Sequence, residues 1–246
     1  KTLHIDVYDM RGIDLHTGTV PRYIGPESPF FPPEWGGGIF SFWRMKEHEN
    51  LTASGWTMDI DLPPLAKASS IAEMEDYPWP DVNWFDFGNL SAELEAWSDF
   101  SIMATGGSVF QHATYLRGMD TLMLDMMMDP DAANFILDKV AGFYWEYYRR
   151  MFEAAGEQID VFALADDLGM QNTLLISPEL YDCFVAPRLK MMADLAHQYG
   201  IRLLLHTCGN IELLIPRFIE AGVDILDPIQ PESMDPLLIK KKYGTD

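Results

Sequence analysis

The stretch IRLLLHTCGNIELLIPRFIEAGVDILDPIQ, residues 201–230, contains the pattern that decides the fold. An apolar run ends in polar residues, a helix-like stretch follows, and a second apolar run starts at Val223. Between the two runs, apolar residues recur at i, i+3, i+4, i+7 and i+8, which is typical of one face of a helix that Gly222 ends. Strand, helix and strand in this order predict parallel strands covered by helices. The helix face consists of Ile211, Leu214, Ile215, Phe218 and Ile219.

The same alternation extends along the chain on both sides of this stretch. Helix-like segments are expected at 109–127, from Asp129-Pro130 to Gly156, from Ser177-Pro178 to Gly200, and within 234–244, because proline at the first helical position and glycine after the last one mark helix ends. Apolar runs that predict strands occupy residues 101–107, 160–167, 201–208 and 223–230, with a fifth at 3–8.

Polar residues or glycines lie at the carboxyl end of each of the four later strands. An open doubly wound sheet would bring only the strands beside its switch point to a ligand, whereas in a (β/α)8 barrel all carboxyl ends converge on one mouth. The sequence therefore favours a TIM barrel. Closure needs eight strands and five are found, so we expect an incomplete barrel, trimmed at both ends. The four ends are Gly106-Gly107, Asp166-Asp167, His206-x-Cys208 and Asp227-Pro228-x-Gln230.

We expect residues 1–246 to form one domain with two regions of different composition. Residues 1–95 are rich in glycine, proline and tryptophan, which predicts short strands and ordered loops, including a hairpin around Asn50 and Ser54-Gly55. Residues 96–246 contain the regular strand and helix units.

Composition excludes several classes of function. The formal net charge is −21, so neither nucleic acid nor a membrane surface is an expected partner. Two cysteines, no signal peptide and no apolar run approaching the ~20 residues of a membrane span predict a cytoplasmic protein. The sequence has no GK[ST] loop, no G-x-G-x-x-G after a strand and no G-x-S-x-G turn, which disfavours nucleotide-dependent and catalytic-triad chemistry.

His206 and Cys208 are the candidate metal ligands. Residues i and i+2 of an extended segment point the same way, and an imidazole nitrogen with a thiolate sulfur suits zinc. The alternative is a buried histidine beside an inert cysteine. A third ligand must come from a carboxylate or from sequence outside this chain. We expect Cys183, in a helix beside Phe184, to be a small buried side chain rather than a ligand.

Other candidates keep two interpretations each. Adjacent strand residues face opposite sides, so at most one of Asp166 and Asp167 is expected to face the mouth. Either one of them caps the following loop, or one holds substrate or orients a metal-bound histidine. Tyr115 is either a catalytic side chain near the mouth or a packing residue, and nearby His112 is expected to be a hydrogen-bonded core histidine. Gln171 and Gln230 are candidate substrate-binding residues, or ordinary loop amides.

The runs ALADDLGMQNTLLISPELYDCFVAPRLKMMADLAHQYG and LLLHTCGNIELLIPRFIEAGVDILDPIQPE resemble the uroporphyrinogen decarboxylase superfamily, as do YPWPD near residue 77 and ATYLRG near 113. The similarity is closer to its branch of zinc-dependent corrinoid methyltransferases. That resemblance implies a (β/α)8 barrel in which His206 and Cys208 bind zinc, with a third cysteine ligand beyond Asp246. It implies methyl transfer between a small methylated compound or a thiol and a corrinoid (cobalamin) on a partner protein. The oligomeric state is left open, with a homodimer as one option.

Two other functions remain open. One is decarboxylation of a tetrapyrrole, as in the decarboxylase branch, with Tyr115 and an aspartate positioning the substrate. The arginine-rich R-Q-A-G-R-type motif of that branch is not in this sequence, and Asp166-Asp167 replaces its serine-containing turn. The other is a barrel that binds a corrinoid or porphyrin without catalysis.

Overall fold

The computed structural model describes residues 15–17, 20–26, 43, 47–52, 55–60 and 63–244, with the backbone alone in 47–60. Its centre is a sheet of five parallel strands in the order β1-β6-β7-β8-β9. Each strand is added to the same edge of the sheet in chain order, as in a (β/α)8 barrel, so the doubly wound alternative is wrong. The strands are β1 (Leu15–Thr17), β6 (Ser101–Thr105), β7 (Val161–Ala165), β8 (Arg202–His206) and β9 (Ile225–Asp227).

The strand predicted at residues 3–8 lies outside the described residues. Besides the four strands predicted later in the chain, the sheet contains β1. The predicted hairpin is confirmed, because β3 and β4 pair antiparallel with Thr52 opposite Gly55. The remaining elements of this part are short. They are β2 (Arg22–Tyr23), β3 (Glu47–Thr52), β4 (Gly55–Ile60), α1 (Ile71–Glu75), a 3-10 turn (Val82–Trp84), β5 (Phe85–Asp86) and α2 (Leu90–Glu95).

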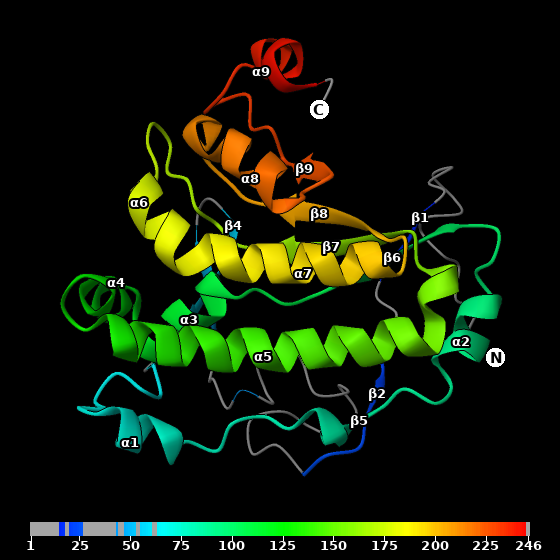
Figure 1. Cartoon of the computed structure of the whole chain (residues 1–246), viewed down its shortest axis with the longest axis horizontal. Coiled ribbons are helices and arrows are strands. Elements are labelled where there is room, and N and C mark those ends of the chain that lie inside the picture. Colours follow the sequence, from blue (N-terminus) through cyan, green and yellow to red (C-terminus); the bar gives the residue numbers. More distant parts are fainter. Residues whose placement is uncertain are drawn as a thin grey trace.

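Helices cover one face of the sheet, and Figure 1 shows the long α5 and α7 running side by side with α8 next to α7. Aromatic side chains of α5 pack on this face, where Tyr148 and Phe152 contact Phe162 of β7. Within the described residues, none of the helices is both long and apolar enough to cross a membrane. The helices are α3 (Phe110–Arg117), α4 (Met119–Met128), α5 (Pro130–Ala155), α6 (Pro178–Leu180), α7 (Ala186–Gln198), α8 (Ile215–Ala221) and α9 (Pro236–Tyr243).

The helix ends follow the predicted capping residues. Asp129 accepts a hydrogen bond from the Ala132 amide at the start of α5, and Ser177 accepts one from the Leu180 amide at the start of α6. Proline follows each cap, since its fixed φ suits the first helical turn. Gly222 ends α8 in the left-handed conformation with φ 96°.

Three sequence predictions are wrong in detail. The helix expected at 109–127 is broken into α3 and α4 at Gly118, whose φ is 90°. Ile219 is 37% exposed, because it borders a pocket between α8 and α9 rather than the core. Cys183 is exposed, because the π-helical turn at Tyr181–Val185 buries Tyr181, Phe184 and Val185 and leaves Asp182 and Cys183 outside.

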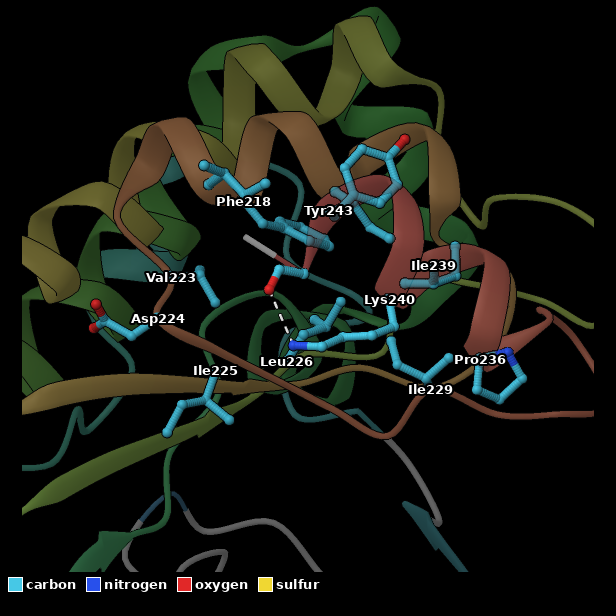
Figure 2. A pocket seen from close by; sticks show the side chains of 13 residues that line it. Phe218, Val223, Asp224, Ile225, Leu226, Ile229, Pro236, Ile239, Lys240 and Tyr243 are labelled. Atoms are coloured by element: carbon cyan, nitrogen blue, oxygen red, sulfur yellow. Dashed lines mark hydrogen bonds between the residues drawn. The ribbon is translucent and has the colours of Figure 1, made fainter. Parts of the chain in front are cut away.

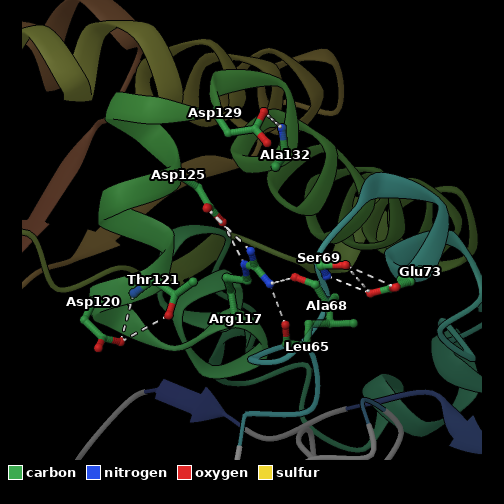
Figure 3. Close-up of polar contacts among 10 residues, drawn as sticks. All are labelled: Leu65, Ala68, Ser69, Glu73, Arg117, Asp120, Thr121, Asp125, Asp129 and Ala132. Atoms are coloured by element: carbon green, nitrogen blue, oxygen red, sulfur yellow. Dashed lines mark hydrogen bonds and ion pairs between the residues drawn. The ribbon is translucent and has the colours of Figure 1, made fainter.

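The break at Gly118 allows Arg117 to join three segments (Figure 3). Its guanidinium donates to Asp125 of α4 at 2.7 Å and to the carbonyl oxygens of Leu65 and Ala68, each at 2.7 Å. The Arg117 and Asp125 side chains are only 8% and 13% exposed, so water cannot replace these bonds. Arg117 therefore fastens the segment before α1 to the corner between α3 and α4.

We expect Arg117→Met to lower the free energy of unfolding by about 3–5 kcal/mol, because it leaves a buried carboxylate and two carbonyl oxygens without their donor. Arg149→Met is the control, because the Arg149–Glu146 pair is about 30% exposed and should contribute less than about 1 kcal/mol. Urea denaturation measures both. Equal losses in the two variants would contradict this account of Arg117.

Candidate metal centre

The registers of three neighbouring strands bring the candidate ligands together. Ala165 of β7 lies opposite His206 of β8, and His206 lies opposite Asp227 of β9. Two residues beyond that row, Asp167 and Cys208 follow the carboxyl ends of β7 and β8. Because side chains alternate along an extended chain, Asp167 points to the same side of the sheet as Ala165, and Cys208 points to the same side as His206.

Alternation also separates the two faces of the sheet. Residues on the helix-covered face are buried, and Asp166 and Thr207 continue that face beyond the strand ends, at 6% and 0% exposure. Asp167, His206 and Cys208 lie on the opposite face and are half-buried. The prediction that the two aspartates face opposite sides is thus confirmed. The buried strand residues are Phe162, Leu164, Leu203 and Leu205.

Asp167, His206 and Cys208 form a group that could hold a metal ion, with one ligand atom from each residue all within 4.8 Å of one another. The separation of His206 Nε2 and Cys208 Sγ is 3.6 Å. Two ligands of a tetrahedral zinc, at about 2.0 Å for nitrogen and 2.3 Å for sulfur, lie roughly 3.5 Å apart. The imidazole and the thiol are therefore already at the separation that zinc requires.

Asp227 fixes the orientation of the imidazole. Its Oδ2 lies 2.8 Å from His206 Nδ1, and a carboxylate can only accept there, so Nδ1 carries the proton. The lone pair of Nε2 then points toward Cys208. A carboxylate behind a histidine is the usual partner of a metal-binding imidazole. The His206 side chain is 41% exposed, so the centre is open to solvent.

The Cys208 thiol is protonated at neutral pH in the metal-free chain. Burial raises its pKa, and the Asp167 carboxylate and the negative charge of Asp227 raise it further. Asp167 also accepts a hydrogen bond from the Cys208 amide at 2.8 Å. A bound divalent cation reverses this balance, because it favours the thiolate among carboxylates.

Two glycines allow the loop after β7 to contact the turn after β8. A Cβ on Gly209, whose φ is 85°, would lie 2.4 Å from the Gly169 carbonyl carbon, and a Cβ on Gly169 would lie 2.6 Å from the Cys208 oxygen. The Asn210 amide donates to the Met170 oxygen at 2.7 Å across this contact. No side chain fits between the two backbones, so the approach of Asp167 to Cys208 requires glycine here.

The two predicted substrate-binding glutamines lie in the loops around this centre. Gln230 accepts a hydrogen bond from the Gly209 amide at 2.5 Å, and exposed Gln171 donates to the Glu232 oxygen at 2.8 Å. Both side chains therefore tie the loop after β9 to its neighbours. Contact with a substrate remains a prediction for both.

Tyr115 is not part of the ligand group. It lies in α3, half-buried, with its ring edge-on to His112 at a centroid distance of 6.1 Å. Its catalytic role therefore remains a prediction.

His112 is a buried, hydrogen-bonded core residue, as predicted. Its Nδ1 lies 2.9 Å from the Ser108 oxygen and must donate there, so Nε2 accepts from the Tyr144 hydroxyl at 3.3 Å. Trp43 in turn donates to that hydroxyl at 3.1 Å. Burial lowers the pKa of His112 to about 4, against a partly compensating contribution from the Ser108 hydrogen bond.

A pocket of about 310 Å³ lies apart from the candidate metal centre, between α8, β9 and α9 (Figure 2). Its walls are mainly apolar. The Lys240 side chain extends across it to the Gly244 oxygen at 3.0 Å. The described residues that line this pocket include none of the predicted site residues, so it is separate from the candidate centre.

Acid should destabilise the chain partly through His112. The unfolded chain binds a proton near pH 6.5, but folded His112 binds one only near pH 4. Its contribution is thus fully present above pH 6.5 and is lost as the pH falls through that window, by up to about 3 kcal/mol. Between pH 7.5 and 4.5, urea denaturation should show a smaller loss of unfolding free energy in His112→Asn than in the wild-type chain. The variant keeps all of the other titrating groups. Equal losses in both proteins would refute the assignment.

The contact between the two glycines is tested by a pair of alanine substitutions. Gly200 also has a positive φ, 74°, but a Cβ added there would meet no atom of the described residues within 4 Å. Gly200→Ala should cost about 1–2 kcal/mol of unfolding free energy from backbone strain alone. Gly209→Ala should cost at least about 2 kcal/mol more, because the methyl group overlaps the Gly169 backbone. Similar losses in urea denaturation would show that the contact is not tight.

Comparisons with known proteins agree with this architecture. A search among curated proteins gave no match. Among the solved structures that match, a methyltransferase from Methanosarcina mazei has a TM-score of 0.60 at 18% sequence identity, with 89% of this chain and 58% of that chain covered. This likeness shows a shared fold, and the chain spans 58% of the length of that relative.

The family model described as Uroporphyrinogen decarboxylase (URO-D) matches residues 90–235, which is more than half of the chain. The matched range runs from α2 past β9, and it includes all of the predicted site residues. The chain therefore belongs to the uroporphyrinogen decarboxylase (URO-D) family.

Proposed function

We propose that the chain is a methyltransferase that moves a methyl group between a small methylated compound, or a thiol, and a corrinoid carried by a partner protein, with zinc at the candidate metal centre. One observation carries the proposal. His206 Nε2 and Cys208 Sγ lie 3.6 Å apart on one face of the sheet, with an oxygen of Asp167 within 4.8 Å. Nitrogen, sulfur and oxygen donors form a ligand set that zinc accepts, with a fourth position left for substrate.

Zinc in such a site acts as a Lewis acid, lowering the pKa of a bound thiol or polarising a bound oxygen. His206, Cys208 and Asp167 would hold it. Asp227 keeps the His206 proton on Nδ1, so that Nε2 presents its lone pair to the metal. Asp167 is the candidate third ligand within the described residues, whereas the family resemblance implies a cysteine beyond Asp246 in that role.

The surroundings of the centre support a reaction between a small molecule and a large partner. His206 and Asp227 are 41% and 54% exposed, so the centre is reached directly from solvent. Gln171 and Gln230, on the loops beside it, are the candidates for binding the small substrate. The solved relative named a methyltransferase supports the reaction class.

Decarboxylation of a tetrapyrrole is the second candidate, because the family model that matches the chain carries that name. In this reaction Tyr115 and an aspartate would position the substrate without metal. The grouping of His206 and Cys208 has no role in it. The metal centre therefore favours methyl transfer.

Metal analysis tests the proposal. The purified chain should bind about one zinc ion, and Cys208→Ala should weaken zinc binding by more than about 100-fold, because changes behind a ligand alone cost 10–100-fold. Cys183→Ala is the matched control, since this exposed cysteine lies outside the ligand group and should leave zinc binding unchanged.

Activity is measured as demethylation of free methylcobalamin by a small thiol, followed by visible absorbance. It should depend on zinc and be lost in Cys208→Ala. Zinc binding that is indifferent to Cys208 would contradict the proposal. Release of carbon dioxide from an acetate-bearing tetrapyrrole by the metal-free chain would support the second candidate instead.

A further inference from the structure

We infer that Asp166 is a positioning residue of the metal centre: bonded to Ser108 and the first amides of α3, it fixes the backbone that presents Asp167 and His206 to the metal. The inference rests on the proposed function. Asp166 lies on the helix-covered face, 6% exposed, and so cannot itself reach an ion that Asp167 holds on the other face. Its influence must pass through its neighbours.

The Asp166 side chain caps a helix that has no polar cap of its own. The residue before α3 is Val109, whose side chain cannot accept a hydrogen bond. Asp166 Oδ1 accepts from the Ser108 hydroxyl at 2.5 Å and from the Gln111 amide at 2.8 Å, and Oδ2 accepts from the Val109 amide at 3.1 Å. A carboxylate satisfies the free amides of a helix start and interacts favourably with its dipole.

The backbone of Asp166 is held from the opposite direction. Its amide donates to the His206 oxygen at 2.9 Å, which links it directly to a candidate ligand residue. The next residue is Asp167, whose Oδ1 accepts from the Cys208 amide at 2.8 Å. A rotation of the chain at Asp166 would therefore move Asp167 away from Cys208 and disturb His206 at once.

Helix α3 is a firm anchor for this contact. The Ser108 oxygen accepts from His112 Nδ1, and His112 in turn binds the Tyr144 hydroxyl of α5. Ser108 thus connects the carboxylate of Asp166 to the buried side chains between α3 and the longest helix. Ser108 and Asp166 therefore hold the candidate metal ligands in a fixed position relative to the core.

Asp160, which is exposed, provides a comparison at the other end of the same strand. Asp160 Oδ2 accepts from the Ser101 hydroxyl at 3.0 Å and from the Ile102 amide at 2.9 Å. It joins β7 to β6 by the same chemistry, but at the amino end, away from the metal centre. If Asp166 only joined neighbouring strands, as Asp160 does, replacing it would leave the zinc affinity of the folded chain unchanged.

The test compares Asp166→Asn, Ser108→Ala and Asp160→Asn with the wild-type chain. Asparagine keeps the volume but replaces one acceptor oxygen by a donor that faces hydrogen-bond donors. Zinc affinity is measured by competition with a chromophoric chelator. Urea denaturation first establishes conditions under which each variant is folded. Cobalt(II) in place of zinc reports ligand geometry through its visible absorption bands.

We expect Asp166→Asn to weaken zinc binding by about 10–100-fold and to alter the cobalt spectrum, as changes behind metal ligands do. Ser108→Ala should have a smaller effect in the same direction, and it decides the question if Asp166→Asn does not fold. Asp160→Asn should bind zinc within about twofold of wild type.

Wild-type affinity and spectrum in both folded Asp166→Asn and folded Ser108→Ala would overturn the inference while leaving the proposed function intact. An equal loss in Asp160→Asn would also overturn it, because the effect would then be general. A wild-type chain that binds no zinc would overturn the proposed function itself.

Discussion

The pairing register of β7, β8 and β9 is the constraint on which the site depends. Ala165, His206 and Asp227 lie in one row across these strands. That row places an imidazole beside the carboxylate that orients it, and it places Asp167 and Cys208 next to each other beyond the strand ends. A slip of one residue would move the side chains of a strand to the other face of the sheet. The candidate metal ligands would then face the helix-covered core.

Several contacts stabilise this register at the carboxyl edge. The Leu168 amide donates to the Thr207 hydroxyl at 3.1 Å, and the Thr207 amide donates to the Asp227 oxygen at 2.8 Å. The backbone approach of Gly169 and Gly209 completes the connection, and the glutamine at 230 fixes the same turn. The chain itself therefore sets the geometry of the candidate centre, which would reduce the ordering that metal binding requires.

Local patterns predicted much of this arrangement. Alternation along a single strand was enough to place His206 and Cys208 on one face and to separate Asp166 from Asp167, because both conclusions need only two-residue periodicity. Helix caps at Asp129 and Ser177 were likewise readable from adjacent residues. The order of the strands followed from the polar residues at their carboxyl ends.

Features that depend on distant segments could not be predicted in this way. The identity of the third candidate ligand, and the partnership of Asp227 with His206, depend on registers between strands far apart in the sequence. The hydrogen bonds of Arg117 to the carbonyl oxygens of residues 65 and 68 likewise join segments that are far apart in the sequence. The outward turn of Cys183 depends on a π-helical turn, which leaves no periodic signal in five residues.

The central claim is that an imidazole nitrogen and a thiolate sulfur, two residues apart on β8 and its following turn, hold one zinc ion together. X-ray absorption at the zinc edge of the zinc-loaded chain tests it most directly. The account predicts one sulfur neighbour at about 2.3 Å, together with nitrogen and oxygen neighbours at about 2.0–2.2 Å. A coordination shell of nitrogen and oxygen alone would contradict it.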